Sequence, residues 1–144
     1  MTPTERRAAE RTATRERLTA FYAAFNRVVT GRDGADELAP ILEAGVVWTD
    51  ATTGDRAGRT ETGIDAVLEN VVLATGQRVG HLQALPERFV DAGERTIVTG
   101  AYVGTVDGRA FDVPFAHAFA VRDGRIRRWT AYRDPTLERS VFDA

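Results

Sequence analysis

Several residue types that carry common protein chemistry are absent or scarce in this chain of 144 residues, which has no cysteine, no lysine and two histidines. Without cysteine there is no disulfide framework, no thiolate nucleophile and no thiolate-bound zinc or iron–sulfur site. Without lysine there is no Schiff-base chemistry and no Walker-type phosphate loop. All 19 basic residues are arginine, which stays protonated near neutral pH. Carboxylate, imidazole and phenol groups therefore remain for proton transfer.

A strong charge of one sign and long apolar runs are also missing. With 19 basic and 21 acidic side chains the net charge is −2, which gives no support for nucleic-acid binding. The apolar runs are too short to span a bilayer, and residues 1–14 are polar, without the apolar core of a secretory signal. We therefore expect a cytoplasmic protein with no nucleic-acid or membrane partner. Arginine in place of lysine points to coding DNA rich in G and C, and so to a bacterial source.

The first half of the chain has helical periodicity. Leu18, Phe21, Tyr22, Phe25 and Val29 share the spacing of one helix face. The pattern predicts helices over 16–29, 35–42 and 62–74, the last capped by Thr60 or Thr62, and a strand over 46–50.

The second half alternates apolar and polar residues, as strands do. Asp-Gly pairs at two of the joints are typical of hairpin turns. Helices followed by an antiparallel meander predict one α+β domain, with helices on one face of the sheet and solvent or a partner chain on the other. The predicted strands cover 82–90, 94–104, 109–121 and 125–133.

The order of these elements resembles the cone-shaped nuclear-transport-factor-2-like fold, and within it the ketosteroid isomerases and SnoaL-like polyketide cyclases. The residues that carry the resemblance are 21–26, 48–50, 63–66, 113–126 and 129–134. It implies three N-terminal helices packed on a strongly curved, mostly antiparallel sheet, and a homodimer. The expected domain covers 15–135, with a flexible segment or frayed helix start at 1–14 and a tail at 136–144. This fold hosts isomerases, cyclases, epoxide hydrolases, dehydratases and binding modules.

Asp50 is the first candidate catalytic residue, because it closes the otherwise apolar strand predicted over 46–50. The general base of ketosteroid isomerases resembles it in position. A carboxylate against apolar walls is a better base than one in water. The alternative interpretation is a strand-end aspartate that caps the following turn.

His117 is the second candidate, as a single polar residue among Phe115, Phe119 and Val121 on one strand face. A histidine occupies the matching place in SnoaL-like cyclases, and an acidic hydrogen-bond donor does so in ketosteroid isomerases. A neutral imidazole can donate to a substrate oxygen. The alternative is a core histidine satisfied by a backbone carbonyl or by Asp50.

Neither family's full catalytic set is present. The tyrosine donor of ketosteroid isomerases matches Phe21, and Tyr22 lies about 100° further around the helix. The catalytic aspartate of SnoaL-like cyclases matches Ala131. The resemblance therefore leaves Asp50 and His117 as a hybrid pair, with Tyr22 as a weaker third member.

Large side chains are together available as a cavity wall that suits a flat hydrophobic substrate, although each one alone is better explained by core packing. The sequence has no metal-site signature, and no cofactor is expected. We interpret the arginines at 122, 125, 127, 128 and 133 as a solvated hairpin and Asp134 as a capping or pairing residue. The predicted substrate-binding residues are Phe25, Trp48, Tyr102, Phe115, Phe119 and Trp129.

These observations favour a cofactor-independent enzyme of bacterial secondary metabolism that acts on a small hydrophobic, polyketide-like carbonyl compound. Asp50 would remove a proton next to the carbonyl and His117 would stabilise the enolate oxygen, as in an isomerase, a cyclase or a dehydrating lyase. Epoxide hydrolysis is an alternative that needs a second carboxylic acid from Asp55, Glu61 or Glu87. A non-catalytic binding or dimerisation module is the other alternative, which is favoured if Asp50 and His117 bond each other or backbone in a small cavity.

Overall fold

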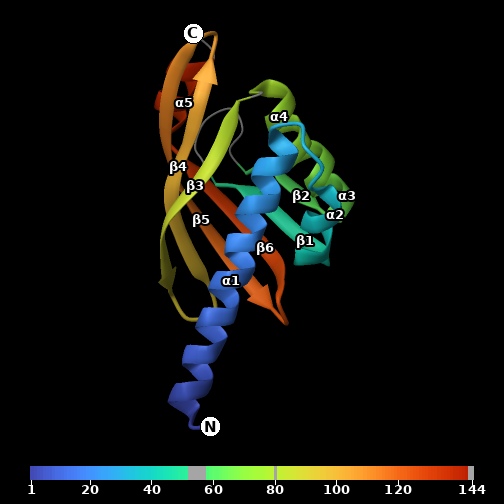
Figure 1. The fold of residues 1–144 in the computed structure, drawn as a ribbon, viewed down its shortest axis with the longest axis vertical. Coiled ribbons are helices and arrows are strands. Elements are labelled where there is room, and N and C mark those ends of the chain that lie inside the picture. Colours follow the sequence, from blue (N-terminus) through green and yellow to red (C-terminus); the bar gives the residue numbers. More distant parts are fainter. Residues whose placement is uncertain (52–57, 80, 143–144) are drawn as a thin grey trace.

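A six-stranded curved sheet forms the body of the protein in a computed structural model that describes residues 1–51, 58–79 and 81–142. Helix α1 (Pro3–Val29) lies across one face of this sheet, and the short helices between residues 35 and 78 gather beside it (Figure 1). The strand order is β2-β1-β6-β5-β4-β3. The strands are β1 (Leu42–Asp50), β2 (Thr60–Thr62), β3 (Leu82–Asp91), β4 (Thr96–Val106), β5 (Arg109–Arg122) and β6 (Arg125–Arg133). The expected α+β architecture is therefore confirmed.

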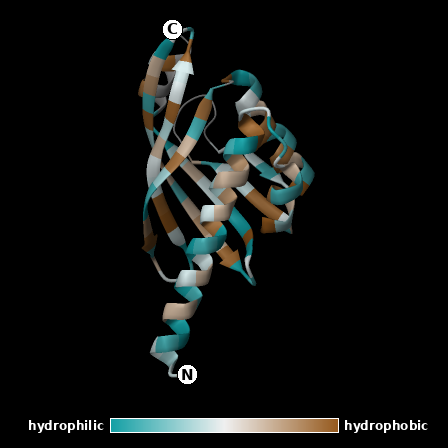
Figure 2. Cartoon of the chain, viewed as in Figure 1, coloured by the Kyte–Doolittle hydropathy of each residue, from teal (hydrophilic) through white to brown (hydrophobic). Residues whose placement is uncertain are grey.

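Helix α1 begins at Pro3, well before the first residue of its apolar face. The Thr2 hydroxyl accepts a hydrogen bond from the backbone N–H of Glu5, and proline is well suited to the first helical position. Residues 1–13 are exposed, and the buried face starts at Leu18. The first turns project beyond the sheet and are mostly polar (Figure 2). The apolar pattern of the sequence therefore indicates only the C-terminal half of the helix, which packs in the core.

The predicted hairpins over the second half of the chain are confirmed. Asp107-Gly108 and Asp123-Gly124 all have positive φ angles, between 51° and 77°, as the tight turns between right-twisted strands require. Strands β1 and β6 pair in parallel, and the other described strand pairs are antiparallel.

The remaining helices differ from their predicted limits. β1 starts at Leu42, so the helix expected over 35–42 shortens to α2 (Ala35–Leu38) and a 3₁₀ turn (Ala39–Ile41). The predicted threonine caps are wrong, because residues 60–62 form strand β2 and Gly63 precedes the helix. That helix is divided into α3 (Ile64–Val67), a π-helical segment (Leu68–Leu73) and α4 (Ala74–Arg78).

The segment expected as a tail forms helix α5 (Pro135–Phe142). The Asp134 carboxylate accepts hydrogen bonds from the backbone N–H groups of Thr136 and Leu137, which confirms its capping role. Among the described residues no helix is long and apolar enough to cross a membrane.

Replacement of Gly100 in β4 tests how closely this strand packs against Leu85 of β3 and Phe115 of β5. An added Cβ would overlap the carbonyl oxygen of Leu85 and lie 2.9 Å from Phe115 Cζ, whereas Gly45 has nothing within 4 Å. Gly100→Ala is expected to lower the free energy of unfolding by about 1–3 kcal/mol. The control Gly45→Ala should change it by less than about 0.5 kcal/mol. Urea unfolding measures both, and equal values for the two variants would contradict this packing.

Candidate active site

A cavity of about 170 Å³, partly open to solvent, lies between the inner face of the sheet and the α3–α4 region. An engineered cavity of roughly 150 Å³ takes up a benzene-sized ligand, so there is room for an aromatic ring. Of the predicted wall, Phe25, Trp48, Tyr102 and Trp129 line this cavity. Phe115 and Phe119 lie outside its lining and pack in the core against the ring of His117.

The register of the sheet places the two main candidates in one transverse row. Asp50 of β1 pairs with Ala131 of β6, and His117 of β5 pairs with the same Ala131. Directly paired residues point to the same face, and neighbouring strands are about 4.8 Å apart. Asp50 and His117 therefore stand about 10 Å apart along the row, with only a methyl side chain between them.

Asp50 lines the cavity although it is only 1% exposed. Its Oδ2 accepts a hydrogen bond of 2.5 Å from Nη2 of Arg133, whose side chain is 16% exposed. The backbone N–H of Asp50 donates to the backbone oxygen of Arg59, and the backbone oxygen of Asp50 accepts from the N–H of Gly58, so the strand end is fixed. The carboxylate therefore enters the cavity from a rigid position.

Arg133 corrects the interpretation of the C-terminal arginines as a solvated hairpin. Trp129, Ala131 and Arg133 share the inner face of β6, so strand alternation carries Arg133 into the cavity wall. Arg122 behaves as expected, because its side chain is 57% exposed and bonds Glu43 at the surface. The alternation on β6 can be read from the sequence. The carboxylate that pairs with the Arg133 guanidinium belongs to Asp50 on β1, and the pattern of β6 alone does not indicate it.

His117 is buried between two tyrosine hydroxyls. Tyr22 Oη lies 2.7 Å from Nδ1, and Tyr102 Oη lies 2.7 Å from Nε2. Its partners are thus side chains, and not the backbone or Asp50 as the alternative interpretation required. Tyr22 is 2% exposed and is not part of the cavity lining, whereas Tyr102 is. Tyr102, predicted only as a wall residue, therefore connects the buried imidazole to the cavity.

The imidazole of His117 is neutral. Burial among aromatic rings, together with the nearby guanidinium of Arg133, lowers its pKa from 6.5 to about 3. A neutral imidazole has one N–H and one acceptor nitrogen, so one tyrosine donates to it and the other accepts from it.

The environment of Tyr22 decides the direction of these bonds. Burial, with a smaller effect of Tyr102, raises the pKa of Tyr22 well above its ordinary range, so the hydroxyl keeps its proton. Among the described residues His117 is the sole hydrogen-bond partner of this hydroxyl. A buried donor needs an acceptor, so Tyr22 donates to Nδ1, and Nε2–H then donates to Tyr102. The proton of Tyr102 is left to point away from the histidine.

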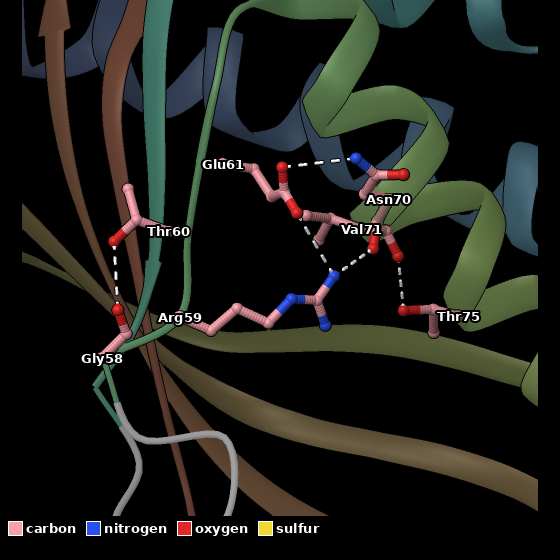
Figure 3. A network of polar contacts seen from close by, with 7 residues as sticks. All are labelled: Gly58, Arg59, Thr60, Glu61, Asn70, Val71 and Thr75. Carbon is pink, nitrogen blue, oxygen red and sulfur yellow. Dashed lines mark hydrogen bonds and ion pairs between the residues drawn. The ribbon is translucent and has the colours of Figure 1, made fainter.

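A polar network that the sequence did not indicate holds another side of the cavity (Figure 3). Arg59 Nη2 donates to the backbone oxygen of Asn70 at 2.7 Å and lies 3.6 Å from Glu61 Oε1. Asn70 Nδ2 also donates to Glu61 Oε2. Asn70 belongs to the π-helical segment, a geometry that is common at functional sites. No sequence signal predicted the π turn, which brings Asn70 and Val71 into the lining.

Of the acids proposed for epoxide chemistry, neither of the two that the structure describes lines the cavity. Glu61 belongs to the Arg59 network, and Glu87 is exposed on β3. Asp55 lies outside the described residues. In the part of the chain that is described, Asp50 is the sole carboxylate of the lining, and no group of three or more metal-ligating side chains occurs.

Comparison with known proteins identifies one family. The sequence model of the SnoaL-like domain family matches residues 18–129. No protein with a curated description matches the chain.

Several solved structures share the fold. TerC, crystallised with polyporic acid, is 21% identical with a TM-score of 0.74, over 92% of this chain and 99% of its own. A candidate SnoaL-like polyketide cyclase from Jannaschia sp. CCS1 is 16% identical with a TM-score of 0.76, over 92% and 93%. A nuclear-transport-factor-2-like protein of unknown function from Burkholderia pseudomallei is 23% identical with a TM-score of 0.71, over 92% and 98%.

The low pKa of His117 gives stability a specific pH dependence. Between about 6.5 and 3 the unfolded chain binds a proton that the folded imidazole refuses, so stability falls as pH drops through this window, by up to about 1.4 kcal/mol per pH unit. His117→Gln keeps a donor and an acceptor but does not titrate. Urea unfolding at pH 5 and 7 should show a steeper loss in the unmodified protein than in this variant. Equal pH slopes would show that His117 is not held neutral.

Proposed function

The chain belongs to the SnoaL-like domain family, and on this premise we propose that it is a cofactor-independent acid–base enzyme, a cyclase or an isomerase, that acts on a small hydrophobic carbonyl compound. One observation carries the proposal: a carboxylate and a phenol bonded to a neutral, buried histidine line the same aromatic cavity. Neighbours of the same fold include a candidate polyketide cyclase and a protein crystallised with polyporic acid, which supports an aromatic, oxygenated substrate.

In the proposed reaction Asp50 removes a proton from the carbon next to the substrate carbonyl. The electron pair of the C–H bond forms a C=C bond, the π pair of the carbonyl moves to its oxygen, and the Tyr102 hydroxyl donates a hydrogen bond to the resulting enolate. An isomerase then returns the proton from Asp50 to another carbon of the enolate. In a cyclase the enolate carbon attacks a second carbonyl of the same molecule, whose π pair moves to its oxygen, and the new alkoxide takes up the proton that Asp50 removed.

His117 and Tyr22 act in this proposal through Tyr102 and not on the substrate. The Nε2–H group of His117 donates to the Tyr102 oxygen, which makes the Tyr102 hydroxyl a stronger donor. Tyr22 fixes the tautomer that allows this. The catalytic set predicted as Asp50, His117 and Tyr22 thus becomes Asp50 and Tyr102, with His117 and Tyr22 as positioning residues. Arg133 orients the carboxylate of Asp50.

We also propose that the protein forms a homodimer. Leu85, Val90 and Tyr132 are exposed large hydrophobic residues, each more than 40% accessible. Their pairing partners Ala101, Ile97 and Ala116 alternate with inward residues, so all three lie on the outer face of the sheet. Exposed apolar side chains on the outer face of a sheet suit contact with a second copy.

Proton exchange at carbon tests the acid–base assignment without the natural substrate. The protein is expected to accelerate exchange of the α protons of 2-tetralone in D₂O, followed by proton NMR. Asp50→Asn should reduce the enzymatic rate at least about 100-fold, because the base is lost. The control Asp65→Asn, an exposed carboxylate on α3, should leave it unchanged.

The same assay tests the donor with a matched pair of tyrosines. Tyr102→Phe should slow exchange by about 100-fold, and Tyr132→Phe on the outer face should have no effect. Circular dichroism confirms that each variant is folded. Full exchange activity in Asp50→Asn would refute the assignment of the base.

A further inference from the structure

Guanidinium groups outnumber carboxylates in the lining of the cavity. Within the described part of the chain the lining contains Arg59, Arg78 and Arg133, but a single carboxylate, that of Asp50. The charge of Asp50 is already matched by Arg133, from which it accepts a hydrogen bond. A cleft whose lining carries an excess of one sign attracts ligands of the opposite sign. The lining therefore favours a ligand that carries a negative charge.

Arg59 is the guanidinium whose surroundings suit such a ligand best, and it lies where the cavity is open. Its side chain is 38% exposed, and the neighbouring lining residue Asn70 is exposed as well. The floor of the cavity is different, because Trp48, Asp50 and Trp129 are all buried. Solvent and a ligand can thus reach the Arg59 guanidinium without any rearrangement of the core.

The hydrogen-bonding capacity of Arg59 is only partly used (Figure 3). Nη2 donates to the backbone oxygen of Asn70, and the same atom lies 3.6 Å from Glu61 Oε1, which is too far for a hydrogen bond. The other terminal nitrogen, Nη1, points away from both residues in Figure 3 and has no hydrogen-bond partner among the described residues. Glu61 accepts instead from Nδ2 of Asn70. One end of the guanidinium is therefore available to an acceptor from outside the protein.

Two contacts hold Arg59 in place before a ligand binds. The hydrogen bond to Asn70 is 2.7 Å long, and the guanidinium carbon lies over the Trp48 ring, 5.4 Å from its centroid, in a cation–π contact. An arginine that is fixed in advance loses little side-chain entropy on binding. Its planar group is also well matched to a carboxylate, with which it forms short, charge-assisted hydrogen bonds.

We propose that Arg59 binds a carboxylate of the ligand at the open side of the cavity, so that the substrate class is an aromatic carbonyl compound with a carboxylate substituent. Nη1 donates to the carboxylate, and the aromatic body lies deeper in the cavity, beside Trp48. A neutral amide or ester of the same shape makes a weaker contact, because it lacks the charge. This role of Arg59 rests on the proposed function only in taking this cavity as the ligand site, since it requires neither Asp50 nor Tyr102.

Benzoate and benzamide test the charge of the ligand, because they have nearly the same size and shape and only benzoate is charged at pH 7. Titration of the ¹⁵N-labelled protein, followed by NMR, gives the dissociation constant of each probe. Benzoate should bind about tenfold more tightly than benzamide at low salt, as expected for a hydrogen bond between charged groups. The preference should decrease as salt is added, because the guanidinium is partly exposed.

Variants of three residues assign this preference to Arg59. Arg59→Gln should lower the affinity for benzoate to that for benzamide. The control Arg122→Gln removes a surface guanidinium that also lies beside a glutamate, and it should retain the preference. Glu61→Gln removes the carboxylate that competes for Arg59 and should raise the affinity for benzoate about threefold. Circular dichroism confirms that each variant is folded, and Glu61→Gln tests the assignment even where Arg59→Gln does not fold.

The ratio of the two affinities separates binding from a purely structural role. If Arg59 only supported the π-helical segment, Arg59→Gln would weaken both probes equally and leave their ratio unchanged, and the proposed anion site would be wrong. Equal affinities in the unmodified protein, or binding of neither probe, would also overturn it. Asp50→Asn and Tyr102→Phe should retain the preference for benzoate even where proton exchange of 2-tetralone is lost, so failure of the acid–base assignment gives a different result.

Discussion

The need to satisfy one buried imidazole organises the centre of this protein. His117 is surrounded by Phe115, Phe119 and Trp129, where a charged or unpaired polar ring would be costly. The two tyrosine hydroxyls meet this need from opposite sides, one from α1 and one from β4. The bonds fix the position of the helix over the sheet and give the imidazole one tautomer. A series of hydrogen bonds from Tyr22 through His117 to Tyr102 thus runs from the core to the cavity.

The sheet supplies the second constraint, because its register decides which groups share the cavity. Asp50, Ala131 and His117 form one row across three strands, and Trp48, Trp129 and Phe119 form the next row on the same face. In the cyclases that the sequence resembles, the aspartate matches Ala131. Here the small alanine leaves space in the middle of the row, and the carboxylate stands one strand further away, held by Arg133. The same face thus carries a carboxylate from a neighbouring strand.

Much of this arrangement is visible in the sequence, and the missing parts have physical causes. Strand alternation and Asp-Gly turns predict β3 to β6, since both signals are local. The end of β1 places Asp50 at the cavity for the same reason. The role of Tyr102 and the Asp50–Arg133 pair depend on contacts between distant strands, which alternation does not encode. The polar half of α1 carries no apolar signature, and the apolar residues of the π turn do not distinguish it from an α-helix, so the limits of both were missed.

The proposed site depends most directly on the protonation state of His117 in the folded protein, which long-range ¹H–¹⁵N NMR of the imidazole reports at pH 7. The chain from Tyr22 to Tyr102 predicts a neutral ring with the proton on Nε2 and an unprotonated Nδ1 that accepts from Tyr22. Tyr22→Phe should disturb this tautomer, because it removes the donor to Nδ1. A ring that carries its proton on Nδ1, or that is doubly protonated, would contradict the account.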